Sequence, residues 1–241
     1  FLGGEVLDTR RLPFVVGFGV LRTRLPGGSI IVEDGAYSPI SSEVWVTEEV
    51  YRYDYGAQTT DTILEYDIAR GRGAMASMPP FSPWGAFAAS ETRMITVRGD
   101  RAEVRVHDTK GTLSEIWRWS EQPPPTTGEI WDAWVERVMT GGGRSSEQER
   151  RARLAEQREL MPSTLPFTSS IHLDDRGRAW IGEYSIRGDA GLYRVFSSEG
   201  RRLVNVRVPP RTTVLDIRHG RLLAVVLDDF DVPTAPLFDL S

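Results

Sequence analysis

The stretch that decides the fold runs from residue 173 to residue 184 and reads LDDRGRAWIGEY. Its first part, Asp174 to Gly177, has the composition of a type I turn, which favours aspartate early and glycine at its end. Its second part, AWIGEY, is a short apolar run typical of a buried strand. The stretch therefore predicts a tight turn that feeds a buried strand, with Trp180 as its main packing residue.

The same pattern of a small-residue turn and a β-branched run occurs at three other places. They are LPGGSIIVEDG at 25–35, SETRMITVRGD at 90–100 and RHGRLLAVVLDD at 218–229. Three further segments alternate apolar and polar residues around a glycine, which predicts an outer β-hairpin each time. They are residues 63–73, 102–119 and 192–208. Such self-similarity is the signature of a repeat architecture.

The repeat has the length of a propeller blade. From Ala179 to Leu222 the spacing is 43 residues, and one four-stranded blade takes about 40 to 50 residues. Earlier spacings are longer because residues 36–60 and 121–167 are interpreted as insertions. The predicted fold class is all-β, a β-propeller with about four blades visible, and residues 1–241 are expected to form a single domain or a propeller fragment.

The second insertion, 121–167, predicts an α-helical hairpin between two blades. Prolines punctuate both of its ends, in EQPPPTTG and MPSTLP. Apolar residues from Ile130 to Val138 recur at helical spacing, and the glycine run at 140–146 marks a bend. Ser146 is a plausible N-cap for the second helix.

Over nearly its whole length the chain resembles the six-bladed, NHL-like β-propeller proteins of Gemmatimonadota-type bacteria. The residues that carry the resemblance lie at 13–37, 62–71, 102–113, 158–167, 173–184 and 195–203. These motifs determine turns and strands, so the resemblance is architectural and implies no catalytic residues. It implies a six-bladed ring with further blades before Phe1, and a periplasmic or cell-envelope protein, anchored through a missing N-terminus.

Composition excludes several functions. The net charge of -5 argues against general attraction to nucleic acid or to an anionic membrane surface. No apolar run approaches the roughly 18 to 20 residues of a membrane span. Without cysteine there is neither a disulfide nor a thiolate site.

Acidic residues and a histidine supply weak metal candidates. His172 and Asp174 alternate along one strand, so they are expected to share a face. Asp228 and Asp231 offer oxygen ligands that suit calcium, although the spacing and central glycine of an EF-hand are missing. A metal ion would need further ligands from elsewhere in the fold. Turn chemistry is therefore the favoured interpretation of both segments.

Four of the seven tryptophans, Trp117, Trp119, Trp131 and Trp134, fall close together where the second insertion begins. The favoured interpretation is that they pack the helical hairpin onto a blade. The alternative is that some stay exposed and anchor a protein partner, because tryptophan is enriched at interface hot spots.

The chain has no G-x-S-x-G, G-x-G-x-x-G or P-loop motif. The sequence therefore predicts no catalytic residue and no cofactor, and the chain is expected not to be an enzyme. The leading hypothesis is a non-catalytic propeller that serves as a protein-interaction, accessory or scaffold subunit in the bacterial cell envelope. One alternative is a metal-dependent, gluconolactonase-like hydrolase. Another is a periplasmic-side structural subunit of a large membrane-associated complex.

Overall fold

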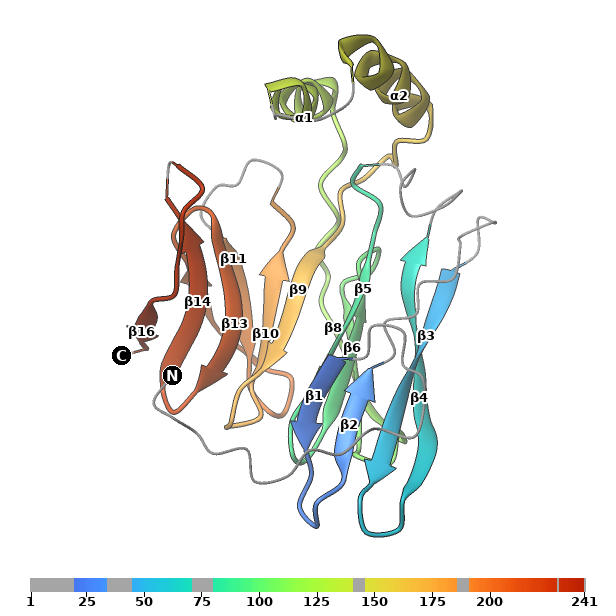
Figure 1. Ribbon diagram of the computed structural model, residues 1–241, viewed down its shortest axis with the longest axis vertical. Helices are drawn as coiled ribbons and strands as arrows, with labels where there is room; N and C mark the ends of the chain where they lie inside the picture. Colours follow the sequence, from blue (N-terminus) through green and yellow to red (C-terminus); the bar gives the residue numbers. More distant parts are fainter. Residues whose placement is uncertain are drawn as a thin grey trace.

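The structure is a computed structural model that describes residues 20–33, 45–70, 80–140, 146–185, 191–228 and 230–240. These residues form four antiparallel four-stranded sheets, each built from consecutive strands (Figure 1). The first two sheets contain β1 (Val20–Arg24), β2 (Ile30–Glu33), β3 (Trp45–Asp54) and β4 (Thr59–Arg70), then β5 (Gly85–Ala89), β6 (Met94–Arg98), β7 (Glu103–His107) and β8 (Leu113–Arg118). The other two contain β9 (Thr168–Leu173), β10 (Ala179–Glu183), β11 (Leu192–Phe196) and β12 (Arg202–Arg207), then β13 (Thr212–Arg218), β14 (Arg221–Leu227), β15 (Pro233–Thr234) and β16 (Leu237–Asp239).

The sheets stand side by side as the blades of a propeller. The first strand of each sheet is the inner one, since β5 contacts both β1 and β9, and β9 contacts β13. In three sheets the strands lie side by side in the order in which they follow one another in the sequence. In the fourth sheet, β14 pairs with β13, β15 and β16. The predicted fold class, an all-β propeller with four visible blades and an inserted helical hairpin, is confirmed. The six-bladed ring stays a prediction.

Side chains between neighbouring blades form the core. Ile31 and Met94 lie in the cluster between the first and second blades, and Ile181 lies in the cluster between the second and third. Trp180 and Ile217 lie between the third and fourth. Because each strand alternates its side chains between two faces, a blade with neighbours on both sides buries both faces. This explains the apolar runs in the predicted strands that became β6 and β10, which belong to the second and third blades.

The interpretation of residues 36–60 as an irregular insertion is wrong for the described part, which begins at Trp45. Strands β3 and β4 form a long hairpin there, closed by backbone hydrogen bonds from Gly56 and Ala57 to the Asp54 carboxylate. Tyrosine and threonine favour strands, but most side chains of β3 are only half-buried, and the run of Thr47, Glu48 and Glu49 interrupts the apolar alternation. The hairpin predicted at 63–73 is instead the end of β4, as far as the structure describes it.

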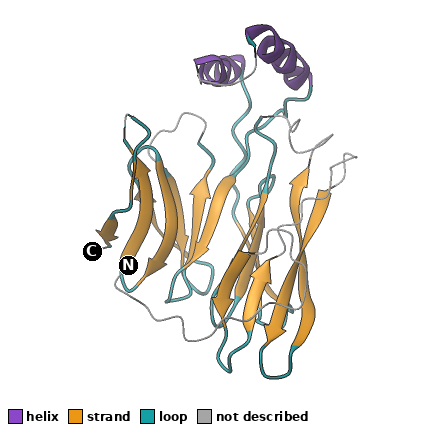
Figure 2. Cartoon of the chain, viewed as in Figure 1, coloured by secondary structure: helices purple, strands orange, loops and turns teal. Residues whose placement is uncertain are grey.

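Two helices, α1 (Gly128–Thr140) and α2 (Glu147–Glu159), lie between β8 and β9, inside the predicted insertion. They stand beyond the ends of the sheets, joined to them by two extended segments (Figure 2). Ser146 is the N-cap of α2, as predicted, and forms a capping box with Glu149. Among the described residues, neither helix combines the length and the apolar character needed to cross a membrane.

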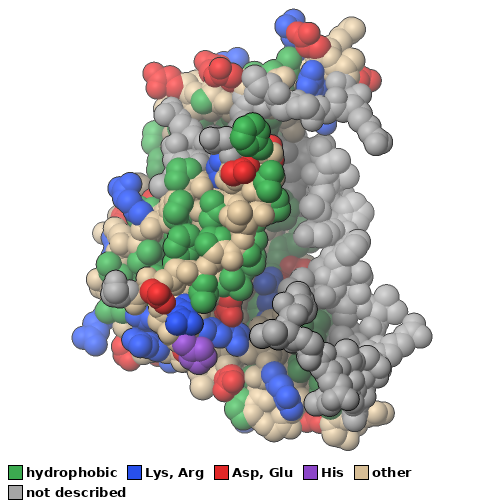
Figure 3. All heavy atoms as spheres, turned by 60° about the vertical axis from the view of Figure 1, so that its left-hand side comes forward, with side chains coloured by type: hydrophobic (Ala, Val, Ile, Leu, Met, Phe, Trp, Pro, Cys, Tyr) green, Lys and Arg blue, Asp and Glu red, His purple; other side chains and the backbone are tan. Residues whose placement is uncertain are grey.

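The fourth blade exposes apolar side chains on its outer face, which is turned forward in Figure 3. Leu215, Leu223 and Leu237 are all more than one-third exposed there. Phe230, in the turn between β14 and β15, is 86% exposed. In the described residues this face has no neighbouring blade, unlike the faces of the second and third blades.

Candidate functional site

A groove lies where the helical hairpin joins the third blade, and we call it the hairpin-base groove. Its volume is about 260 Å³. One wall comes from the segment leading to α1, and the others come from the start of β9 and from β10 and β11. The lining residues are Glu121, Gln122, Pro124, Pro166, Phe167, Glu183, Tyr184 and Arg194.

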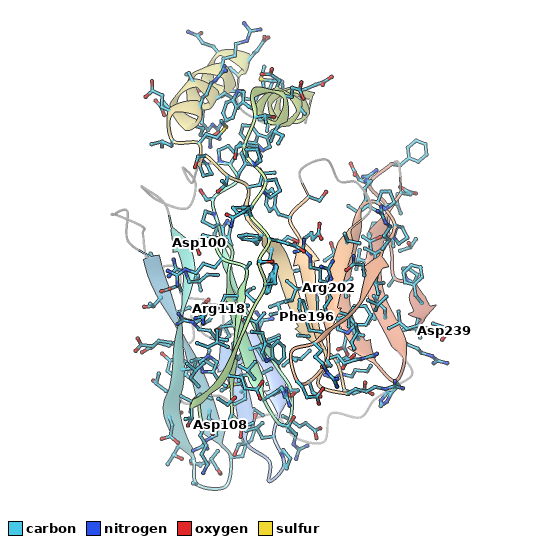
Figure 4. The ribbon with its side chains drawn as sticks, turned by 180° about the vertical axis from the view of Figure 1, so that it is seen from behind. Asp100, Asp108, Arg118, Phe196, Arg202 and Asp239 are labelled. Atoms are coloured by element: carbon cyan, nitrogen blue, oxygen red, sulfur yellow. The ribbon has the colours of Figure 1, made fainter. Side chains whose placement is uncertain are left out.

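Arg194 is the central charged residue of this groove. Its side chain is only 11% exposed, and its Nη2 atom lies 2.6 Å from Glu121 and 2.7 Å from Glu183. Its Nε and Nη1 atoms are buried and have no hydrogen-bond partner among the described residues. Arg202 of the neighbouring strand also binds Glu121, at 3.0 Å. Figure 4 shows Arg202 on the third sheet, seen from behind.

A second concave site lies between the first and second blades, with a volume of about 190 Å³. Its charged residues pair with one another: Arg98 binds Asp67 at 3.0 Å, and Glu103 accepts from Arg105 at 2.9 Å and from Arg118 at 2.8 Å. Burial acts to raise the pKa of Glu103, but the two arginine hydrogen bonds outweigh it and lower the pKa. The interblade cleft is thus largely neutralised by its own ion pairs.

His107 lines the same cleft and is buried. Its Nδ1 atom lies 3.2 Å from the carbonyl oxygen of Gly111, so we assign the proton to Nδ1. This leaves Nε2 to accept from the Thr96 hydroxyl at 3.5 Å. Burial lowers the pKa of His107, which favours the neutral ring. A Thr96 hydroxyl beside the His107 ring is the arrangement of a nucleophile and its general base. At 3.5 Å, however, this hydrogen bond is too weak to activate the hydroxyl.

His172, a weak metal candidate from the sequence, lies on the inner strand β9. Its Nε2 atom is buried and has no hydrogen-bond partner among the described residues, and its ring centroid lies 6.0 Å from that of Tyr193. Burial lowers the pKa of His172 to about 4, while Asp216 on β13 acts to raise it and Arg22 on β1 to lower it. Charged residues of two other inner strands therefore act on the buried ring, with effects of opposite sign.

Asp174, the second candidate, is committed to other contacts. Its carboxylate accepts hydrogen bonds from the backbone of Arg176 and Arg178, from the Arg178 side chain at 2.6 Å and from the Trp180 indole at 3.0 Å. These contacts occupy both oxygens, and the side chain is 1% exposed. The structure places Asp174 in the turn that the sequence favoured.

Asp228 and Asp231 also lie in a turn. The Asp228 carboxylate accepts from the backbone N–H groups of Phe230 and Val232, while Asp231 pairs with Arg211. Across the described ranges, no group of three or more metal-ligating side chains comes together. The structure therefore does not bring these two aspartates, His172 or Asp174 into a common site.

The four tryptophans divide into two pairs. Trp117 is 7% exposed and Trp119 is partly buried, and both rings pack against that of Phe196. Phe196, labelled in Figure 4, lies between the second and third blades. Trp131 is 3% exposed and lies 5.2 Å from Trp134, centroid to centroid, within the helical hairpin. Packing thus accounts for the position of all four rings. Their role as partner anchors stays a prediction.

Sequence reasoning missed the hairpin-base groove because its charged residues are far apart in the chain. Glu121, Glu183 and Arg194 meet only when β8, the hairpin and the third blade have folded. One local signal was present: Arg194 interrupts the apolar strand LYRVF. A charge within such a strand needs a buried partner or an exposed face.

Comparisons with known proteins gave likenesses to solved structures only. No family model matches the chain, and no curated protein does. Similar solved structures include a gluconolactonase from Xanthomonas campestris at 15% identity (83% of this chain, 51% of that chain, TM-score 0.39). Others are a luciferin-regenerating enzyme at 14% (92% and 61%, TM-score 0.40) and a GH43 β-1,3-galactosidase at 13% (90% and 70%, TM-score 0.40). The chain spans about half of that gluconolactonase.

The prediction that the chain is not an enzyme, which relies on the missing sequence motifs, is wrong. All three of these similar structures are enzymes by name. A propeller can gather reacting groups from separate blades, and such groups leave no contiguous motif in the sequence. The likenesses are too distant to assign any activity to this chain.

Proposed function

We propose that the chain is a protein-interaction subunit, of the accessory or scaffold type, whose helical hairpin binds its partner. The proposed location is the bacterial cell envelope, which rests on the architectural resemblance to exported propellers. A binding role for the hairpin is compatible with chemistry in the blades.

The observation that carries the proposal is the position of α2. The helix lies beyond the ends of the sheets (Figure 1), and Leu154 is its only buried residue. The blades do not need α2 to complete their clusters, since the three interblade clusters contain no residue from it. A polar helix held away from the core in this way is available for a partner.

The hairpin is nevertheless held in a defined orientation. Phe81 and Leu165 from the blade side pack with Trp131 and Leu154 from the two helices. The isolated bridge between Pro125 and Thr164 joins the two extended segments at the base. Because the orientation is fixed by packing, binding would not incur the full entropic cost of ordering the hairpin.

The test is site-specific photo-crosslinking in the source cells, with the photoreactive residue placed at Glu156 on α2. Arg207 on β12 gives the matched control, because it is exposed on a strand far from the hairpin in the sequence. A discrete protein adduct is expected from position 156 and not from position 207. Equal adducts at the two positions would contradict the proposal.

A second variant replaces residues 127–161 with a short Gly-Ser linker and keeps the bridged segments at the base. The purified variant should retain the strand signal in circular dichroism, because the interblade clusters remain. It should lose capture of the protein that position 156 crosslinks. Unchanged capture by the folded variant would show that the hairpin is not the binding element.

A further inference from the structure

Two charged side chains of the interblade cleft take no part in its close ion pairs. Glu65, on β4, is exposed and has no hydrogen bond or ion pair with any described residue. Arg101, in the turn between β6 and β7, is 47% exposed, and its Nε atom lies as far as 3.9 Å from the Asp100 carboxylate. Both residues line the cleft, so both charges are open to a molecule that enters it from solvent.

Arg105 adds accessible hydrogen-bond donors to the same cleft. Its Nε atom donates to Glu103 at 2.9 Å, and its side chain is 45% exposed. Its Nη1 and Nη2 atoms, which carry four of the five N–H groups of a guanidinium, have no partner in the described part of the chain. Arg105 can therefore bind an oxygen ligand without giving up its contact with Glu103.

The free charges lie on opposite walls of the cleft. The first blade contributes Glu65 on β4, and the second contributes Arg101 and Arg105. Arg98 of the second blade binds Asp67 of the first at 3.0 Å, which joins the walls at one place and cancels those two charges. Within the described ranges, no ion pair joins Glu65 to an arginine. A negative group thus faces positive ones across a space that side chains of this chain do not bridge.

The two walls differ in the ligand groups that they suit. A carboxylate matches the forked donors of an arginine, whereas an ammonium group, with three donors and no acceptor, matches the carboxylate of Glu65. A ligand with only one of these charges would leave one wall without a partner. The volume of the cleft, about 190 Å³, lies below the range of about 300 to 1,000 Å³ for drug-sized ligands, so the ligand is small.

We propose that the interblade cleft binds a small zwitterion, a molecule of amino-acid size that carries an ammonium group and a carboxylate. The ligand carboxylate accepts from Arg101 and Arg105, and the ligand ammonium donates to Glu65. The cleft contains no residue of the helical hairpin, so this site is separate from partner binding by α2.

The experiment titrates the full chain by calorimetry at pH 7 with glycine, β-alanine, γ-aminobutyrate and 5-aminovalerate, in which the two charges lie progressively farther apart. At least one of the four is expected to bind, and the one that binds best reports the distance between the walls. Propylamine and propionate carry one of the two charges each and should bind at least about tenfold more weakly. Absence of binding by all four zwitterions overturns the proposal, and so does equally tight binding of propylamine or propionate.

Two variants assign the charges to the walls. Glu65→Gln should weaken binding of the best zwitterion about tenfold or more and should not weaken binding of propionate. Arg101→Gln should weaken binding of the zwitterion and of propionate, and should not weaken binding of propylamine. Both positions are exposed, so both variants are expected to fold, which circular dichroism checks.

Glu91→Gln is the matched control for Glu65→Gln. Glu91 is exposed in the turn between β5 and β6 and does not line the cleft, so this variant should bind the zwitterion like the wild type. Equal zwitterion affinity of Glu65→Gln and the wild type would overturn the proposal. The purified chain alone is titrated, so these outcomes are distinguishable from those of the crosslinking test.

Discussion

Trp180 donates a hydrogen bond from its indole Nε1 to the carboxylate of Asp174 over 3.0 Å, and both side chains are buried. The contact joins the turn at 174–177 to the core between the third and fourth blades, in which Trp180 lies. Arg178 lies against the same ring, with its guanidinium carbon 5.9 Å from the centroid. An aspartate that resembled a metal ligand is therefore part of the packing of Trp180.

The same turn recurs along the chain. In each copy one side chain accepts from the backbone N–H groups two and four residues later, and the residue three positions later has a positive φ angle. The accepting residues are Asp108, Asp174, Ser197 and Asp228, and the positive-φ residues are Gly111, Gly177, Gly200 and Asp231. The repetition allows one copy to serve as the control for another.

Replacing Asp174 should destabilise the protein strongly. Asp174→Ala leaves the Trp180 indole and part of the Arg178 side chain without their buried acceptor, which predicts a loss of about 3 kcal/mol. Asp228→Ala removes the same turn contacts at an exposed position and should cost about 1 kcal/mol. Urea unfolding followed by tryptophan fluorescence measures both. Similar losses in the two variants would show that burial against Trp180 adds nothing to the turn.

Gly200→Ala tests close packing separately from backbone conformation. Gly200 has a φ of 76°, and a Cβ atom there would lie 2.5 Å from the Trp117 ring. Gly27 also has a positive φ, 90°, but nothing lies within 4 Å of its Cβ position. Gly27→Ala should cost about 1 kcal/mol for the conformation alone, and Gly200→Ala should cost clearly more. Thermal unfolding of the two variants provides the comparison, and a smaller loss for Gly200→Ala would contradict it.

His172 should make stability depend on pH. Burial lowers the pKa of His172 in the folded protein to about 4, from 6.5, so the unfolded chain binds the proton more readily between these values. Stability should therefore fall as the pH drops below about 6.5, by about 1.4 kcal/mol per pH unit at most, and level off near pH 4. His172→Gln should remove this part of the slope in urea unfolding. If His172→Gln leaves the slope as it is, the ring of His172 is not its cause.

Ser146→Ala should loosen the start of α2. The Ser146 hydroxyl accepts from the backbone of Glu149, and the Glu149 carboxylate accepts from the backbone of Ser146. Loss of such a cap costs about 1 kcal/mol. Limited proteolysis should cleave the variant faster within 146–160, whereas Thr164→Ala, at the base of the hairpin, should not change cleavage there. Equal cleavage rates for Ser146→Ala and the wild type would contradict the prediction.

The sequence predicts the blades well because the second strands of the first three are buried on both faces. Ile31, Met94 and Ile181 each sit in an apolar run bounded by turn residues, and no long-range information is needed to find such runs. The Ser146 cap is equally local. Strand β3 was missed because its consecutive polar residues Thr47, Glu48 and Glu49 interrupt the apolar alternation. The hairpin-base groove was out of reach because Glu121, Glu183 and Arg194 become neighbours only in the folded blade.

The blades contact one another through layers of side chains, so the arc behaves as a chain of nearest neighbours. Within the described residues, the second and third blades each have a core cluster on both sides, whereas the fourth has one cluster and an exposed apolar face. Opening should therefore begin at the fourth blade and move inward. In native-state hydrogen exchange, amides of β13 and β14 should exchange before those of β6 and β10. The order of exchange along the sequence would then follow the order of the blades in space.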